Sequence, residues 1–270
     1  MSRFIWVVVG LLTLQEGASA QTEQFRFQSA KVPVGTIYHY EKSNIDGSHK
    51  SLISLYVPAQ DRLESLKWQP GSSEATLVVA EMDWTRYSVR RLQSYSLTAG
   101  KTPTLKAVLE YRSGEDRVVA RAIGKEWKVA IGQWPWHSYD FDFASLNFTL
   151  PHLREPTASF RFGIADVVYL PAGPEFAYKG AVECRYESEE RRHETLCRKY
   201  RVDGAGLEQR GGFLWVDKTR QHIVDYEIEL PDEPGFRNGK LRLLRSEPVS
   251  LETWQQFKAA PGKQPPPAKH

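Results

Sequence analysis

The chain has 270 residues, with 36 Lys and Arg against 33 Asp and Glu, which gives a net charge of +3. A charge this mild argues against a dedicated nucleic-acid binder, because such proteins present a clustered basic face. Nucleic acid is therefore not an expected partner. After the first 20 residues, no apolar run approaches the roughly 20 residues that a membrane-spanning helix needs.

The first 20 residues have the pattern of a secretory signal peptide. Arg3 supplies a positive charge, Phe4 to Leu14 form an apolar run, and Ala18-Ser19-Ala20 supplies the small residues of a cleavage site. The apolar run is too short to span a bilayer core of about 30 Å. We therefore expect cleavage near Ala20 and a mature protein that works in the periplasm or is secreted.

From Thr36 onward, short alternating runs recur at the spacing of about 8–12 residues that is typical of antiparallel proteins. Turn residues such as Asp46-Gly47 and Asp203-Gly204 separate them. The pattern predicts an all-β, mainly antiparallel fold rather than alternating βα units. No low-complexity break divides the chain, so residues 21–260 are predicted to form one domain. The Pro-rich tail at 261–270 is predicted to be disordered.

Two segments have the spacing of helices. Ser250 is a predicted N-cap for a helix at 251–259, whose Trp254 and Phe257 share one face. Residues 139–153 have apolar side chains three and four apart, with Asp142 as the predicted cap. A meander of a dozen or more strands has to curl to manage its edges. We expect a half-barrel or open barrel covered by one or two short helices.

Cys184 and Cys197 are the only cysteines. In an exported protein an even pair favours a disulfide. If residues 189–192 form a hairpin loop, then Ser188 faces His193 and the two cysteines stand directly opposite each other. Facing Cα atoms about 4.5–5.5 Å apart lie within the range that a disulfide accepts. The sequence therefore predicts a Cys184–Cys197 disulfide, with two buried thiols as the alternative.

The densest aromatic segment lies between residues 127 and 148. Large aromatic side chains can line an apolar ligand cavity, and they can equally form a core plug under a sheet. Pro135 prevents a regular strand between two tryptophans, which favours a loop or rim position. Our candidate ligand-binding residues are Trp134, Trp136, Tyr139, Phe141 and Phe143.

The chain carries no catalytic motif that we recognise, such as Gly-x-Ser-x-Gly or His-Glu-x-x-His. His137, Asp140 and Asp142 do not match the ligand spacing of a zinc or calcium site. The pairs Glu81/Asp83 and Glu227/Glu229 are more simply solvated strand positions than glycosidase carboxylates. We therefore expect a non-enzymatic protein without a metal or another cofactor.

Two stretches resemble a known group of exported proteins. The segment 212–218, Gly-Phe-Leu-Trp-Val-Asp-Lys, with the return run 223–227, resembles bacterial periplasmic proteins of the lipoprotein-localisation-factor-like superfamily. The stretch 38–44 and the segment 140–153 resemble uncharacterised exported proteins near that group. The resemblance implies an unclosed antiparallel barrel with helices over its concave side, and by analogy a role in handling lipid.

Three hypotheses of function follow. The first is a periplasmic protein whose curved sheet holds a lipid or acyl chain. The second is a structural or assembly protein with a partner at the outer membrane, which predicts an interior filled by side chains. The third is a secreted carbohydrate-active enzyme that uses one of the acidic pairs.

Overall fold

Most strands that follow each other in the chain lie side by side in one sheet of 15 strands. The computed structural model describes residues 22–259, so the predicted leader at 1–20 and the predicted tail at 261–270 lie outside the described residues. Adjacent strands pair antiparallel, except that the short strand at Trp136–His137 pairs parallel with Phe160–Leu170. The all-β prediction is confirmed.

The sheet consists of two meanders. The first contains β1 (Thr36–Ser43), β2 (Ser51–Ala59), β3 (Arg62–Trp68), β4 (Glu74–Asp83), β5 (Ser88–Thr98), β6 (Thr104–Arg112), β7 (Arg117–Ala122) and β8 (Lys125–Val129). The second contains β9 (Trp136–His137), β10 (Phe160–Leu170), β11 (Gly173–Arg192), β12 (Thr195–Asp203), β13 (Gly212–Asp217), β14 (Ile223–Ile228) and β15 (Gly239–Pro248). The helical elements are η1 (Ser29–Lys31), α2 (Ala144–Thr149), η2 (Leu150–His152), η3 (Ala205–Leu207) and α3 (Leu251–Ala259).

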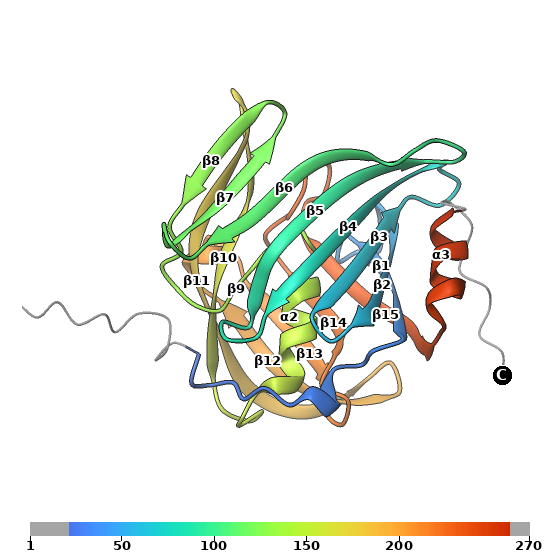
Figure 1. The fold of residues 1–270 in the computed structure, drawn as a ribbon. Helices are drawn as coiled ribbons and strands as arrows, with labels where there is room; N and C mark the ends of the chain where they lie inside the picture. Colours follow the sequence, from blue (N-terminus) through green and yellow to red (C-terminus); the bar gives the residue numbers. More distant parts are fainter. Residues whose placement is uncertain (1–21, 260–270) are drawn as a thin grey trace, which may run out of the picture.

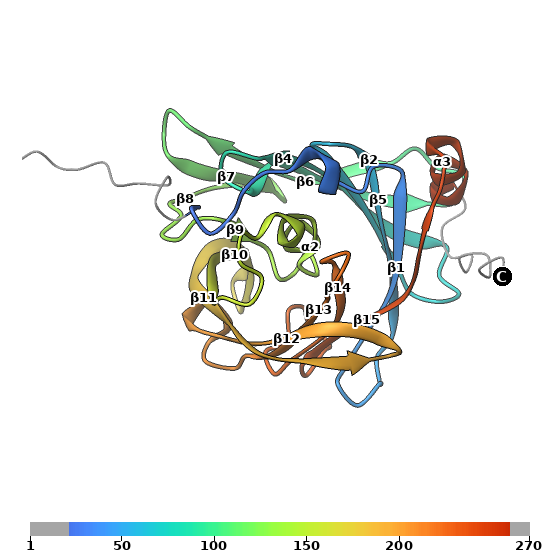
Figure 2. The ribbon, with the colours of Figure 1, turned by 90° about the horizontal axis from the view of Figure 1, so that it is seen from below.

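The two meanders join where β1 pairs with β15, in a register that sets Thr36 opposite Pro248. This pairing leaves β8 and β9 as the two edges of the sheet. The right-handed twist of neighbouring strands accumulates over so many strands and curls the sheet. The sheet wraps around α2 without closing into a barrel (Figures 1 and 2). The predicted half-barrel with a helix on its concave side is therefore the observed fold.

The alternation of side chains along each strand separates two apolar clusters. On β1, Tyr38 and Tyr40 belong to the large cluster inside the curve, whereas Ile37 belongs to a smaller cluster on the outer face. The period of two residues that predicted the strands therefore also assigns the inner and outer faces.

Helix α3 begins and ends at the residues that the sequence predicts. The Ser250 hydroxyl accepts a hydrogen bond from the Thr253 backbone N–H at 3.1 Å, as an N-cap does. Trp254 is fully buried against the outer face, where its ring stacks on Tyr56 with centroids 5.2 Å apart. This helix therefore packs on the convex side of β1 to β3, whereas α2 lies on the concave side (Figure 1).

Helix α2 is shorter than the predicted helix at 139–153, and Asp142 does not cap it. Asp142 and Phe143 both have φ near +51°, in the left-handed region, so a regular helix cannot run through them. The Asp142 carboxylate instead forms ion pairs with two lysines. Tertiary ion pairing has replaced the predicted local cap.

The predicted disulfide is wrong. The β11–β12 turn lies at His193-Glu194, beyond the predicted loop, and β11 continues through residue 192 with a bulge near Tyr186. Cys184 consequently pairs with Val202, whereas Cys197 pairs with Glu190. Both thiols are free and buried, Cys184 in the inner cluster and Cys197 in an outer cluster under Trp215. A shift in the turn has moved the cysteines apart and onto opposite faces.

Candidate functional site

The predicted aromatic segment enters the concave side from β9 and the loop before α2. Trp136 and Tyr139 are each only 1 % exposed, and the Tyr139 ring stacks on Phe143 with centroids 4.9 Å apart. Trp134 is also buried, where it meets the edge of Tyr111 at 5.1 Å. Both indoles are therefore buried rather than exposed on a rim. Trp134, Trp136, Tyr139 and Phe143 form the centre of the interior, and we call these four residues the aromatic plug.

The predicted ligand-binding residue Phe141 lines a cavity. This cavity, which we call the Asp140 cavity, has a volume of about 310 Å³. One of its walls is the concave face of β3 to β6, and the other is formed by the loop before α2, β10 and β11. Its principal apolar lining residues are Val78, Leu92, Leu109, Phe141, Val167 and Phe176.

A network of charges closes one side of the Asp140 cavity. The Lys42 side chain is completely buried, and its Nζ lies 2.9 Å from Asp142, 2.6 Å from Asp232 and 3.4 Å from Glu233. Lys67 extends the network, with its Nζ 3.1 Å from Asp142 and 3.3 Å from Glu233. Burial disfavours the charge on Lys42, but the three carboxylates outweigh it and raise the pKa of the ammonium well above its ordinary value.

Asp140 and Asp166 form an acidic pair beside this network. Asp166 is buried and accepts hydrogen bonds from the Ser138 hydroxyl and from the backbone N–H groups of Tyr139, at 2.9 Å, and Asp140, at 3.3 Å. Burial raises the pKa of Asp140 to about 7 and that of Asp166 to about 8. Asp140 lines the cavity, so the cavity contains a carboxyl group that changes charge near neutral pH.

Only a weak signal for this network is present in the sequence. Side chains alternate along a strand, so Lys42 faces inward as Tyr38 and Tyr40 do. A lysine that faces the interior requires carboxylate partners. The positions of those partners were not predictable, because Asp232 lies in a loop 190 residues away. Asp166 likewise lies in a run that reads only as a strand.

The other candidate residues have structural partners. His137 is buried, with its Nδ1 2.9 Å from the Ser145 hydroxyl. Glu81 forms an ion pair with Arg90, and Glu227 forms ion pairs with Arg192 and Lys240. Across residues 22–259, no group of three His, Cys, Asp or Glu side chains is arranged to hold a metal ion.

Two comparisons bear on identity. No protein-family model matches the chain, and no curated protein matches it significantly.

In the described part of the chain, no helix combines the length and apolar character needed to cross a membrane.

Proposed function

We propose that this protein binds a lipid or acyl chain in the Asp140 cavity and works in the periplasm or outside the cell without catalysing a reaction. The observation that carries the proposal is the apolar wall inside the curved sheet. Val78, Leu109 and Val167 face the cavity and remain partly exposed although they lie on the concave side. The resemblance to lipoprotein-localisation-factor-like proteins belongs to the same proposal.

Burying this wall favours an apolar ligand. Each square ångström of apolar surface that a ligand removes from water stabilises the complex by about 25 cal/mol. The cavity volume of about 310 Å³ lies at the lower end of the range of about 300–1,000 Å³ typical of small-molecule sites. A single acyl chain, rather than a whole multi-chain lipid, fits a cavity of this size.

The polar side of the cavity selects the head group. Asp140, Asp142 and Glu233 line it, against one lysine, Lys67. This acidic excess disfavours a carboxylate head group by like-charge repulsion. A neutral hydroxyl or a cationic amine is accommodated, because the Asp140 carboxyl titrates near neutral pH. We therefore expect uncharged or amine-bearing acyl compounds to bind best here.

A pair of variants on β6 tests the proposal. Ala107 and Leu109 line the cavity, so Val108 between them points to the opposite face. Ala107→Trp fills the cavity and should weaken binding of a fluorescent, uncharged acyl probe at least about tenfold, which corresponds to 1.4 kcal/mol. Val108→Trp is the matched control and should bind the probe as the natural protein does.

Mass spectrometry of protein purified without detergent gives an independent measurement. We expect a co-purified acyl compound that Ala107→Trp loses and Val108→Trp retains. If no acyl compound is recovered and the probe does not bind, the proposal is wrong.

An assembly role is the second candidate, supported by the aromatic plug. Trp136, Tyr139 and Phe143 fill the centre of the interior, as a structural barrel requires. This alternative predicts that the natural protein and Ala107→Trp bind neither probe nor lipid, and that both recover the same outer-membrane protein after cross-linking in cells.

A further inference from the structure

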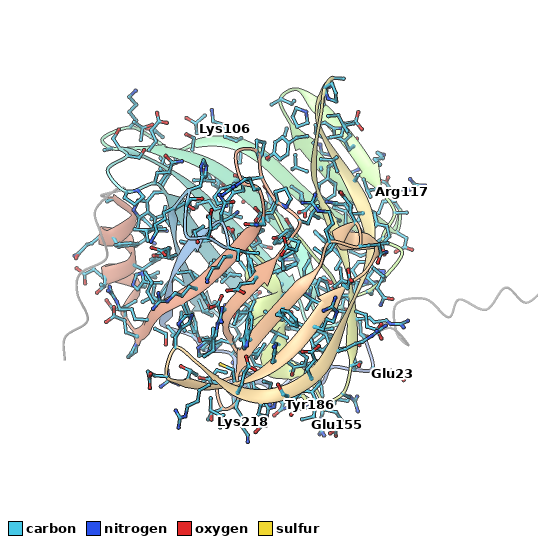
Figure 3. The ribbon with its side chains drawn as sticks, turned by 180° about the vertical axis from the view of Figure 1, so that it is seen from behind. Glu23, Lys106, Arg117, Glu155, Tyr186 and Lys218 are labelled. Carbon is cyan, nitrogen blue, oxygen red and sulfur yellow. The ribbon has the colours of Figure 1, made fainter. Side chains whose placement is uncertain are left out.

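A second cavity lies at the opposite end of the concave side, and we call it the His222 cavity. Its volume is about 540 Å³, and it shares no lining residue with the Asp140 cavity. Lys106 precedes Ala107, which lines the Asp140 cavity, and Lys218 precedes Thr219, which lines the His222 cavity. Figure 3 shows these two lysines near the top and the bottom of the molecule. The two cavities are therefore separate sites.

The inner wall of the His222 cavity is apolar. Leu55 and Val57 come from β2, Leu63 comes from β3, and Phe148 comes from α2. All four belong to the inner apolar cluster. The cavity therefore reaches from the rim of the sheet to the apolar interior, where these nearly fully buried side chains form its floor.

His222 supplies a polar group without a partner. Its side chain is about 95 % buried, since the residue is 5 % exposed, and its ring lies against Tyr38 with centroids 5.1 Å apart. Among the described residues, His222 Nδ1 has no hydrogen-bond partner. Buried nitrogens are normally satisfied by protein, water or ligand, so a molecule bound beside His222 would supply the missing partner.

Two cations flank the same cavity without ion pairs. Lys31 Nζ donates to the Gln221 side-chain oxygen at 3.0 Å, and Arg220 Nη1 donates to the Ser246 hydroxyl at 3.4 Å. Within residues 22–259, neither cation has a carboxylate at ion-pair distance. The charged residues that line the cavity are two cations, Lys31 and Arg220, against one carboxylate, Glu247. Burial, and after it the nearby Arg198, lower the pKa of Lys31.

The neighbouring carboxylates are engaged elsewhere. Glu247 lines the cavity but forms an ion pair with Arg245 at 3.1 Å. Asp217 accepts the backbone N–H groups of Thr219 and Arg220 at 2.7 Å each, which fixes the turn that presents Arg220. Lys31 and Arg220 are thus held beside the apolar wall without a carboxylate partner among the described residues.

We propose that the His222 cavity binds an amphiphile with an anionic head group, a carboxylate or a phosphate monoester on an acyl chain. The head group lies between Lys31 and Arg220 with the His222 imidazole beside it, and the chain packs on Leu55 and Val57. Guanidinium groups bind both anions through paired N–H donors. The inference goes beyond the proposed function and does not rest on it, because the Asp140 cavity has the opposite charge preference.

Calorimetric titration of the full mature protein, freed of lipid, tests this site. The probes are decanoate, decyl phosphate and 1-decanol, which share one chain and differ in the head group. We expect at least one anion to bind about tenfold more tightly than decanol, as a charge-assisted hydrogen bond provides. Equal binding of the three probes would overturn the proposal, and the ranking of decanoate against decyl phosphate identifies the preferred anion.

Variants locate the anion. Arg220→Gln should weaken binding of the preferred anion about tenfold and leave decanol binding unchanged. Arg91→Gln, at an exposed position on β5, is the charge-matched control and should change neither. His222→Phe keeps the ring against Tyr38 and removes the nitrogens, so it should also weaken anion binding. Unchanged anion binding in Arg220→Gln would overturn the proposal.

The Ala107→Trp variant separates this inference from the proposed function. It fills the Asp140 cavity only, so anion binding should persist when binding of the uncharged probe is lost. If Ala107→Trp loses anion binding and Arg220→Gln keeps it, the anion binds in the Asp140 cavity and the inference is overturned.

Discussion

Lys42 Nζ and Asp232 Oδ2 lie 2.6 Å apart inside the curved sheet, although 190 residues separate them in the chain. Both side chains are completely shielded from solvent. The contact ties β1 to the loop between β14 and β15, next to the junction of the two meanders. A charge buried this deeply is stable only while its partners remain in place.

Removing the Lys42 ammonium should therefore destabilise the fold. In Lys42→Met, Asp232 and Asp142 lose a buried cation, and we expect the free energy of unfolding to fall by about 3–5 kcal/mol in urea titrations. Lys50→Met is the matched control, because Lys50 is exposed and forms an ion pair with Glu41 at the surface. Its cost should stay below about 1 kcal/mol. Equal losses in the two variants would contradict a buried network.

Buried histidines should make the protein less stable in acid. Burial lowers the pKa of His137 to about 3, below its ordinary value near 6.5. Below pH 6.5 the unfolded chain takes up a proton that the folded chain excludes. The stabilisation is complete above pH 6.5 and is lost as the pH falls toward 3, by about 2 kcal/mol at pH 5.

The measurement is the free energy of unfolding of His137→Gln and of the natural protein at pH 7.5 and pH 5. The variant cannot take up this proton in either state. Its stability deficit should therefore shrink by about 2 kcal/mol between the two pH values. A deficit that stays constant would show that His137 is not held neutral.

The cysteines should behave as two buried thiols. Burial raises the pKa of Cys184 well above its ordinary value and that of Cys197 to about 12, so few thiolates form at neutral pH. We expect a thiol reagent to label neither cysteine in the folded protein and both after denaturation without reductant. A reductant should leave the melting temperature unchanged. Two unreactive cysteines in denaturant would instead indicate a disulfide.

The outer helix α3 should contribute stability through one residue. Trp254 is fully buried, and its Nε1 donates to Glu64 Oε2 at 2.7 Å. Trp254→Ala removes a large buried ring and should cost about 3–5 kcal/mol of unfolding free energy in urea titrations. Gln255→Ala, at the adjacent exposed position, controls for helix propensity and should cost less than about 0.5 kcal/mol.

The sequence by itself determined the local structure. Alternating apolar residues fix which side chains of β1 face inward, as the contrast of Tyr40 and Ile37 illustrates. The Ser250 cap fixes the start of α3, because its hydroxyl bonds a backbone N–H only three residues away. Such features depend on neighbours within one turn or one strand, so a single sequence contains the information.

Only the tertiary structure decided the sites. The registers of Cys184 and Cys197 depend on a two-residue turn and a bulge, which shift every pair beyond them. The role of Asp142 depends on lysines from β1 and β3, whose attraction outweighs that of a local cap. Both cavities are lined by residues far apart in the chain, and their positions follow from how the sheet curls around α2 (Figure 2).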